Sequence, residues 1–265
     1  MALAELKVRP EYAWVRPDEA RELLCKADLA AWTVLKRGYE LAPFMWEWCD
    51  LIAAYLRLCV IAPRDHAKSE TFTVDQAVWR CQYNPGIYGF VFCNTGDQAE
   101  EIKARIDDAM GEVCPELLEG ARQRAADRTT FSNGSRVRVG GAGKSVRGGH
   151  PDFIIGDDVL EEGSCQSEKQ RKRTENWWKA TVGGMAHPGT WRRVQGRRVW
   201  FPPTRVYLVG TPFHQGDLLM RARHNPLWAW FRYEAEFRQA ARKVATIAGE
   251  TRLTWAVETN QHRGR

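Results

Sequence analysis

The spacing of apolar residues along the chain predicts an alternating order of strands and helices. Four short apolar runs between turn residues have the length of buried strands: 58–62, 87–93, 153–156 and 206–209. Other stretches carry apolar residues at helical spacing: 18–37, 46–56, 69–81 and 99–110. Strands that alternate with helices pair in parallel, so the pattern predicts an α/β fold whose mainly parallel central sheet is flanked by helices.

Three further segments complete the expected order of elements. Asn133-Gly134 separates two short strand-like runs and is a hairpin signal, because both residues tolerate positive φ. A polar helix is expected over 166–179. The segment 183–203 is rich in glycine, proline and arginine, and we interpret it as a basic loop region.

Composition places the chain among ordinary globular proteins. Apolar residues make up 44% of its 265 residues, and the longest apolar stretch, 51–63, is interrupted by Arg57 and too short to cross a bilayer. The first ten residues carry charges where a signal peptide has an apolar core. Seven cysteines stand singly and six histidines are dispersed. We therefore expect a protein without a membrane segment, with free thiols and without a zinc site.

Positive charge is concentrated in Lys169–Arg173, Arg192–Arg198 and Arg221–Arg223 and in the arginine-rich C-terminus. The net charge of +6 is compatible with a nucleic-acid partner. Lysine and arginine are the side chains that bind DNA phosphates without reading the base sequence. The candidates for this role are Lys169, Arg171, Lys172, Arg173, Arg192, Arg193, Arg197 and Arg198. The alternative for each of them is a solvated charged surface.

The segment Ala62–Ser69 has the context of a phosphate-binding loop. It follows an apolar strand, and Lys68-Ser69 opens a helix whose N-terminal N–H groups can surround phosphates. Ala62 and Ala67 stand where the usual pattern has glycine, so we expect a loop of different shape or some strain. The residues expected to contact phosphate are Pro63, Arg64, Asp65, His66, Ala67, Lys68 and Ser69.

A second segment, Gly143-Lys144-Ser145, is closer to the usual glycine-lysine-serine ending of a phosphate-binding loop. Arg138 stands where its first glycine should be. The residues that follow, 147–151, contain two glycines and a proline, and they do not form the helix that phosphate binding needs. We interpret this segment as a glycine-rich turn after the hairpin.

Two carboxylates, Asp157 and Asp158, end the apolar run 153–156. In phosphoryl-transfer sites one acid at the end of a strand holds the shell of Mg²⁺ and its neighbour orients the attacking water. Ser69 and Asp157 are therefore the expected magnesium residues. Asp158 is shorter than the glutamate usual in the water-orienting role, so Glu161 and Glu162 remain alternatives for it.

In their order along the chain, these motifs resemble the ATPase domain of the large terminase subunit, the motor that packages DNA into tailed-phage capsids. Arg64–Ser69 resembles the family's variant phosphate loop, in which an arginine precedes the lysine and hydroxyl. Phe153–Asp158 resembles its second ATPase motif. Val209–Pro212 resembles its coupling motif, and Leu41–Phe44 with Trp46–Trp48 resembles the segment that contacts adenine.

The resemblance implies a P-loop NTPase fold of the ASCE type. It implies an N-terminal helical segment (1–40), a P-loop ATPase domain (41–237) and a C-terminal tail (238–265) to which the sequence pattern assigns no element. ATP and Mg²⁺ are the implied cofactors. Arg64 would sense the γ-phosphate, Arg147 would reach the ATP of a neighbouring subunit, and Phe44 would contact adenine. Gly210 and Thr211 would couple hydrolysis to movement.

The implied activity is Mg²⁺-dependent ATP hydrolysis that drives double-stranded DNA into a viral procapsid in the host cytoplasm. The implied partners are the portal protein, the small terminase subunit and further copies of the chain in a pentameric ring, with a free domain that can be a monomer. The nuclease domain of the family is not expected in this chain, nor is endonuclease activity. Two alternatives stay open: a helicase-like DNA translocase, and a DNA-binding module with a decayed loop.

Overall fold

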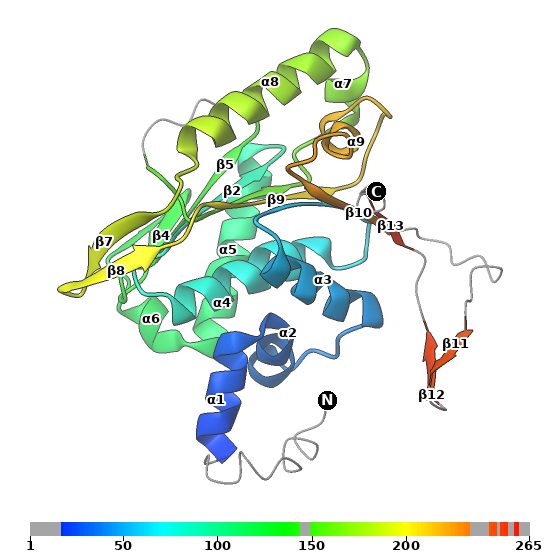
Figure 1. Ribbon diagram of the computed structural model, residues 1–265. Helices are drawn as coiled ribbons and strands as arrows, with labels where there is room; N and C mark the ends of the chain where they lie inside the picture. The colour runs from blue at the N-terminus through cyan, green and yellow to red at the C-terminus, as the bar shows by residue number, and fades with distance from the viewer. Residues whose placement is uncertain (1–16, 144–148, 234–243, 248–249, 254–256, 260–265) are drawn as a thin grey trace.

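A sheet of nine strands forms the centre of the protein in the computed structural model, which describes residues 17–143, 149–233, 244–247, 250–253 and 257–259 (Figure 1). Six neighbouring strands are parallel, in the sheet order β10 (Ala229–Tyr233), β1 (Arg57–Ile61), β9 (Arg205–Gly210), β6 (Phe153–Asp157), β2 (Tyr88–Cys93) and β5 (Arg136–Gly141). Antiparallel strands extend both edges, with β13 (Val257–Thr259) beside β10, then β4 (Arg128–Thr130) and β3 (Gln123–Ala125) beyond β5.

Helices cover both faces of this sheet (Figure 1). One layer contains α2 (Leu29–Trp32), α3 (Pro43–Ala54), the π-helix η4 (Glu70–Asp75) with α4 (Gln76–Tyr83), and α5 (Gly96–Val113). The other layer contains α7 (Glu162–Cys165), α8 (Glu168–Met185) and α9 (Leu218–Ala222). The remaining described elements are α1 (Pro17–Ala27), η3 (Thr33–Arg37), α6 (Pro115–Glu119), β7 (Thr190–Val194), β8 (Arg197–Phe201), β11 (Val244–Ile247) and β12 (Glu250–Leu253).

The central strands are apolar on both faces, which is why they read as continuous apolar runs in the sequence. In β1, Leu58 and Val60 pack into the core under α3 and α4, whereas Cys59 and Ile61 face the core under α8 and α9. Alternate side chains of a strand point to opposite faces, so a sheet covered on both sides buries every position. The predicted α/β fold with a mainly parallel sheet flanked by helices is confirmed.

Several predicted helices are present, with corrected boundaries. The stretch 18–37 is not one helix, because Asp28 ends α1 and caps α2, where its carboxylate accepts the N–H groups of Ala30 (2.8 Å) and Ala31 (3.3 Å). The helix expected over 46–56 begins earlier, at Pro43, and ends at Ala54. Proline is well suited to a first helical turn, where its missing N–H costs nothing.

The interpretation of 183–203 as a loop region is wrong. Residues 183–185 belong to α8, and β7 and β8 form an antiparallel hairpin whose turn is Gln195-Gly196. Both turn residues have positive φ (48° and 80°), as a two-residue hairpin turn requires. The apolar residues of the two strands do not alternate with the arginines in a period of two, so the sequence carried no strand pattern here.

The expectation of free thiols is confirmed. All seven cysteines are free and buried. No helix in the described part of the chain has the length and hydropathy needed to cross a bilayer. The hairpin predicted around Asn133-Gly134 is present as β4 and β5.

Gly156 tests how closely α8 packs on β6. A Cβ atom at this position would lie 2.7 Å from the ring of Trp178 and 2.9 Å from Leu208. We expect Gly156→Ala to lower the free energy of unfolding by about 1–3 kcal/mol, because the ring has to shift.

Gly183→Ala is the matched control, since this helical position has no atom within 4 Å of an added Cβ. It should leave the protein unchanged or stabilise it by up to about 1 kcal/mol in urea unfolding. Equal effects of the two substitutions would contradict the close packing of α8 on β6.

Candidate active site

A cleft of about 880 Å³ opens at the carboxyl ends of the parallel strands. Residues from four separate strand ends line it: Lys68 after β1, Asn94 after β2, Asp158 after β6 and Thr211 after β9. The carboxyl ends of parallel strands are the usual position of ligand sites in open α/β sheets. The predicted loop and the predicted acids therefore meet in one place.

The loop between β1 and the following helix is strained at two residues. Asp65 and Ala67 have positive φ, 61° and 54°, a conformation that favours glycine. Ala62 does not share it, because its N–H donates to the carbonyl of Gly210 (3.3 Å) and continues the ladder of the sheet. The expectation of strain is thus confirmed for Ala67 and wrong for Ala62.

Lys68 is buried and folds back over the loop. Its Nζ donates to the carbonyl of Pro63 at 2.6 Å and reaches Thr211 Oγ1 at 3.4 Å. Burial lowers the pKa of Lys68, while Asp158 and Asp157 oppose that shift. The ammonium group lies beside the positive-φ loop, where an anion placed against the loop N–H groups would meet it.

Asp157 lies at the end of β6 with only 3% of its surface exposed. Its two carboxylate oxygens accept the hydroxyls of Ser69 (3.1 Å) and Thr73 (2.8 Å). Burial and the neighbouring Asp158 raise the pKa of Asp157 to about 6, and the two hydroxyls act in the opposite direction. The contact with Ser69, predicted as the second magnesium residue, joins the helix that follows the loop to β6.

Asp158 differs from its neighbour because it is exposed and lines the cleft. Its φ of 43° turns the chain away from β6, and its Oδ1 accepts the N–H of Thr211 at 3.2 Å. A Cβ atom at Gly210 would lie 2.9 Å from that oxygen, so only glycine leaves room for the contact. The predicted coupling residues Gly210 and Thr211 therefore support Asp158 directly.

Thr211 also touches the phosphate loop. Its Oγ1 donates to the carbonyl of Ala62 at 3.2 Å. One residue at the end of β9 thus contacts Asp158, Ala62 and Lys68. Three of the four non-glycine residues with positive φ in the described chain, Asp65, Ala67 and Asp158, lie in the same cleft, and backbone strain concentrates at functional sites.

The rim of the cleft includes the two predicted alternatives to Asp158 and several residues that the sequence patterns did not single out. Glu161 and Glu162 both line the cleft, and Glu161 accepts the side-chain amide of Asn94 at 3.1 Å. The carboxylate of Glu70 accepts hydrogen bonds from the guanidinium groups of Arg105 (2.5 Å) and Arg37 (2.7 Å). The additional lining residues are Glu70, Asn94, Gln98, Arg105, Leu160 and Phe213. Asn94 carried a usable signal, because it directly follows a buried strand.

Other predicted site residues have varied positions. Arg64 lines the cleft with its guanidinium 5.9 Å from the ring of Phe213. The ring of Phe44 lies 5.7 Å from that of His66, beside the loop, but Phe44 does not line the cleft. Arg147 lies outside the described residues.

The basic segments lie away from the loop. Arg171 is partly buried and donates to the carbonyl of Cys165 (2.7 Å), while Lys169, Lys172 and Arg173 are exposed on α8. Arg192 pairs with the buried Asp152. Exposed arginines of the β7–β8 hairpin are Arg193, Arg197 and Arg198. None of these residues lines the cleft.

The donors in the cleft fit a magnesium nucleotide. A hydroxyl and a carboxylate, Ser69 and Asp157, are hard oxygen ligands of the kind that Mg²⁺ prefers. Within the described ranges, no three His, Cys, Asp or Glu side chains cluster as a metal site. Mg²⁺ bound together with a nucleotide needs no such cluster, because phosphate and water supply most of its ligands. The volume of the cleft is also in the range of small-ligand sites.

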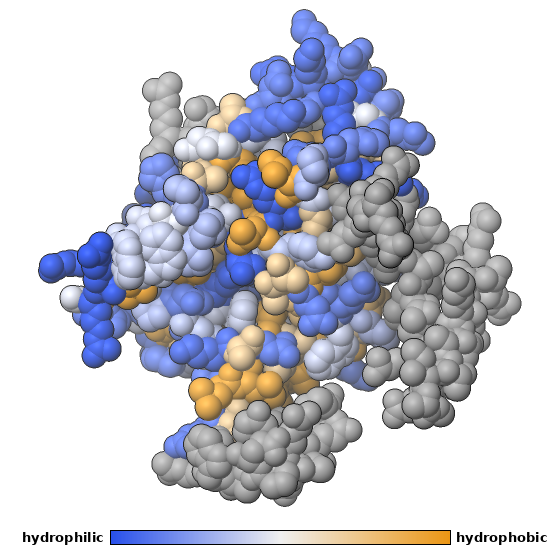
Figure 2. Space-filling model, viewed as in Figure 1, coloured by the Kyte–Doolittle hydropathy of each residue, from blue (hydrophilic) through white to orange (hydrophobic). Residues whose placement is uncertain are grey.

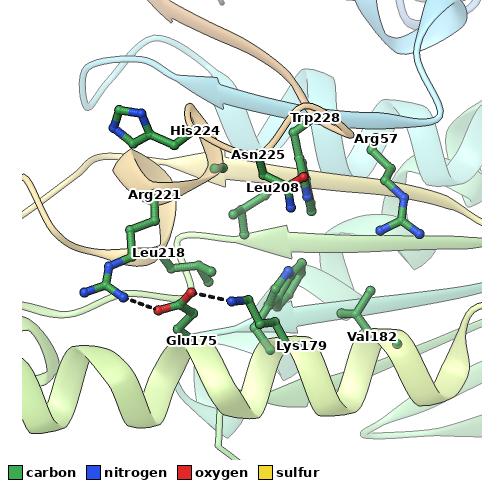
Figure 3. A pocket seen from close by; sticks show the side chains of 13 residues that line it. Arg57, Glu175, Lys179, Val182, Leu208, Leu218, Arg221, His224, Asn225 and Trp228 are labelled. Atoms are coloured by element: carbon green, nitrogen blue, oxygen red, sulfur yellow. Dashed lines mark hydrogen bonds and ion pairs between the residues drawn. The ribbon is translucent and has the colours of Figure 1, made fainter.

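A second cavity, of about 390 Å³, lies between α8, α9 and β9 (Figure 3). The one carboxylate among its described lining residues, Glu175, is paired with both Lys179 (2.6 Å) and Arg221 (2.5 Å). Burial raises the pKa of Glu175, but these two partners outweigh it, so the net shift is downward. With its carboxylate satisfied and its floor apolar, this cavity offers no comparable chemistry.

Among the comparisons with known proteins, the one with solved structures gives matches. No protein-family model and no curated protein matches the chain. Among solved structures, it is similar to the large terminase ATPase domain of Thermus phage P74-26, with 17% identity and a TM-score of 0.47 over 66% of each chain. A mutant of that domain gives 16% identity, a TM-score of 0.43 and the same coverage.

Because both TM-scores are below 0.5, the fold assignment rests on the chain's own topology. β9 lies between β1, which leads into the loop, and β6, which ends in the two acids. The lysine–serine loop and the two acids thus follow parallel strands that have one strand between them.

The raised pKa of Asp157 predicts a gain in stability for Asp157→Asn without metal or nucleotide. The folded protein holds this proton more tightly than the unfolded chain, whose ordinary pKa is 3.8. The free energy of unfolding therefore falls as the pH rises through about 6, and above that pH the whole cost is present.

Asparagine avoids this cost and still bonds to Ser69 and Thr73. We expect the substitution to stabilise the protein by on the order of 3 kcal/mol above pH 6, with no gain below the ordinary pKa. Urea unfolding across this pH range is the measurement, and a gain independent of pH would contradict the assignment.

The loop geometry predicts opposite effects for two alanine-to-glycine changes. At Ala67 glycine relieves a left-handed conformation, and we expect a net gain in unfolding free energy of about 0.5 kcal/mol. At Ala62, which is buried in the core, glycine adds chain entropy and removes a packed methyl group, and we expect a loss of about 1–2 kcal/mol. Thermal unfolding of both variants checks the signs, and a loss at Ala67 as large as at Ala62 would refute the strain.

Proposed function

We propose that the protein is a Mg²⁺-dependent ATPase that translocates double-stranded DNA into a procapsid, as the motor domain of a large terminase subunit. The observation that carries this proposal is the hydrogen bond between Ser69 and Asp157, which are 88 positions apart in the sequence. Ser69, Lys68 and Asp158 line one cleft, and this bond joins Ser69 to Asp157, which is buried behind the lining. These are the groups that phosphoryl transfer to water requires.

The residues of the loop would bind the triphosphate. Lys68 would exchange its bond to the carbonyl of Pro63 for the β- and γ-phosphate oxygens, and Arg64 would sense the γ-phosphate. Ser69 and, through water, Asp157 would hold Mg²⁺, which when bound neutralises charge on the phosphates. Arg147 is proposed to reach the ATP of a neighbouring subunit.

Asp158 is the proposed group that orients the attacking water. One of its oxygens accepts the N–H of Thr211, which leaves the other for water in the cleft. The water would attack the γ-phosphorus, the bond to the β-phosphate oxygen would break, and Asp158 would take the proton, giving ADP and phosphate. Glu161, held by Asn94 on the same rim, is the alternative base, and Glu162 lines the cleft beside it.

Thr211 is the proposed coupling residue. It contacts Asp158 through its N–H and the loop through its hydroxyl, so a displacement of Lys68 or Asp158 reaches the end of β9 directly. The DNA-contacting surface would include the exposed basic residues of α8 and of the β7–β8 hairpin. The portal protein, the small terminase subunit and further copies in a ring are the proposed partners, in the host cytoplasm.

Lys68→Ala provides the test of this function. We expect it to lower the ATP turnover number at least about 100-fold, because the buried ammonium would no longer meet the phosphate charge. Turnover is measured with duplex DNA and assembled portal, with Mg²⁺ and with a chelator. Removal of Mg²⁺ should abolish the activity of the parent protein.

Lys36→Ala is the matched control, because Lys36 pairs with Glu22 at the surface, away from the cleft. It should retain parental turnover. Full activity of Lys68→Ala would refute the loop assignment. Strand separation on forked duplexes would favour the helicase-like alternative, and DNA binding without any turnover would favour a DNA-binding module.

A further inference from the structure

The β7–β8 hairpin presents tryptophan and arginine on one exposed face. The cross-strand pairs Trp191–Trp200 and Arg193–Arg198 share this face, since alternate residues of a strand point the same way. The two indoles are 54% and 47% exposed, and their ring centroids are 5.4 Å apart. Arg198 lies 4.8 Å from the ring of Trp191.

The opposite face of the hairpin holds it firmly on the protein. Arg192 pairs with Asp152, which directly precedes β6, and lies 3.5 Å from the ring of the buried Phe201. His187 contacts the same carboxylate at 3.1 Å. Near the turn, Val194 packs against Gly86, where a Cβ atom would come within 2.7 Å of it. The exposed face is thus carried by an anchored element.

A basic groove of about 490 Å³ lies beside this hairpin. Four arginines line it together with the Asn133-Gly134 turn: Arg122, Arg136, Arg192 and Arg193. No residue that lines the groove is acidic. Arg136 stacks on the ring of Tyr88 at 4.0 Å, and Arg122 donates to the carbonyl of Ser132 at 3.4 Å.

The charge of this region is poorly compensated in the described chain. Asp152 forms an ion pair with Arg192, and Asp127 forms ion pairs with Arg128 and Arg138. No carboxylate of the described residues lies within ion-pair distance of Arg193, Arg197 or Arg198. In the region of the hairpin, Figure 2 shows strongly hydrophilic residues at the protruding tip and residues of intermediate hydropathy behind it.

We propose that the hairpin and the groove bind nucleic acid with unpaired bases. The groove holds backbone phosphates, and Trp191 and Trp200 stack on bases. Arginines alone would satisfy the phosphates of a duplex, whose bases are already stacked on one another, and both indoles would stay exposed. A basic groove together with exposed aromatic rings on the same hairpin is the combination that binds single strands without reading their sequence.

The site is separate from the cleft. It lies where β2 and β5 begin, whereas the cleft lies where β1, β6 and β9 end. The proposal rests on the proposed function only in taking DNA as the partner, and it does not need ATP hydrolysis. Lys68→Ala, inactive as an ATPase, should bind single-stranded DNA as the parent does, so the two proposals fail separately.

Fluorescence anisotropy with labelled DNA tests the proposal on the full chain. The probes are an oligothymidylate of about 20 nucleotides, a blunt duplex of equal length and that duplex with a single-stranded tail. We expect the single strand and the tailed duplex to bind more tightly than the blunt duplex. Trp191→Ala and Trp200→Ala should each weaken single-strand binding about tenfold and leave duplex binding nearly unchanged.

Three further variants separate stacking from charge and from misfolding. Trp191→Phe keeps an aromatic ring and should restore most of the affinity. Arg193→Ala should weaken the binding of both the single strand and the duplex. It should also lower the slope of log affinity against log salt by about the value of one phosphate contact. Leu23→Ala removes a large apolar side chain that is 61% exposed on α1, away from the hairpin, and should change nothing.

Two results would overturn the proposal. One is an unchanged affinity of Trp191→Ala and Trp200→Ala for the single strand, or preference of the parent for the blunt duplex. The other is a self-association of the parent, measured by sedimentation, that both variants abolish while their affinity for DNA stays the same. The exposed face would then be an interface between copies of the chain.

Discussion

The burial of one carboxylate sets the geometry of the cleft. Asp157 is 3% exposed, and a charge in that position is tolerated only if its oxygens are hydrogen-bonded. Ser69 and Thr73, on the helix that follows the loop, supply the two hydroxyls. This requirement fixes the helix against β6, and the start of the helix in turn fixes the backbone of the loop and the position of Lys68.

The second acid has a different position because β9 separates the loop strand from β6. Asp158 turns out of the sheet with positive φ and rests over Gly210, where any side chain would collide with it. Two adjacent carboxylates thus acquire different environments, one buried and one open to the cleft. Different environments are what allow one acid to serve a metal while the other orients water.

Strand β6 also connects two functional regions of the protein. Asp157 at its end contacts the loop, and Asp152 just before its beginning anchors Arg192 of the hairpin. The physical reason is the same at both positions, because each buried carboxylate needs hydrogen-bond donors and receives them from a segment distant in the sequence. The chain thereby places the cleft and the basic aromatic surface at opposite ends of the parallel strands.

The sequence by itself determined the parallel core, the loop 62–69 and the pair Asp157-Asp158, because these depend on local apolar runs and on residues next to each other in the chain. It did not determine the β7–β8 hairpin, whose four arginines and five apolar residues do not alternate with a period of two. The sheet order, the opposite fates of Ala62 and Ala67, and the contacts of Thr211 depend on segments far apart in the chain. Only the tertiary structure decided them, because burial and hydrogen bonding between distant residues leave no periodic trace in the sequence.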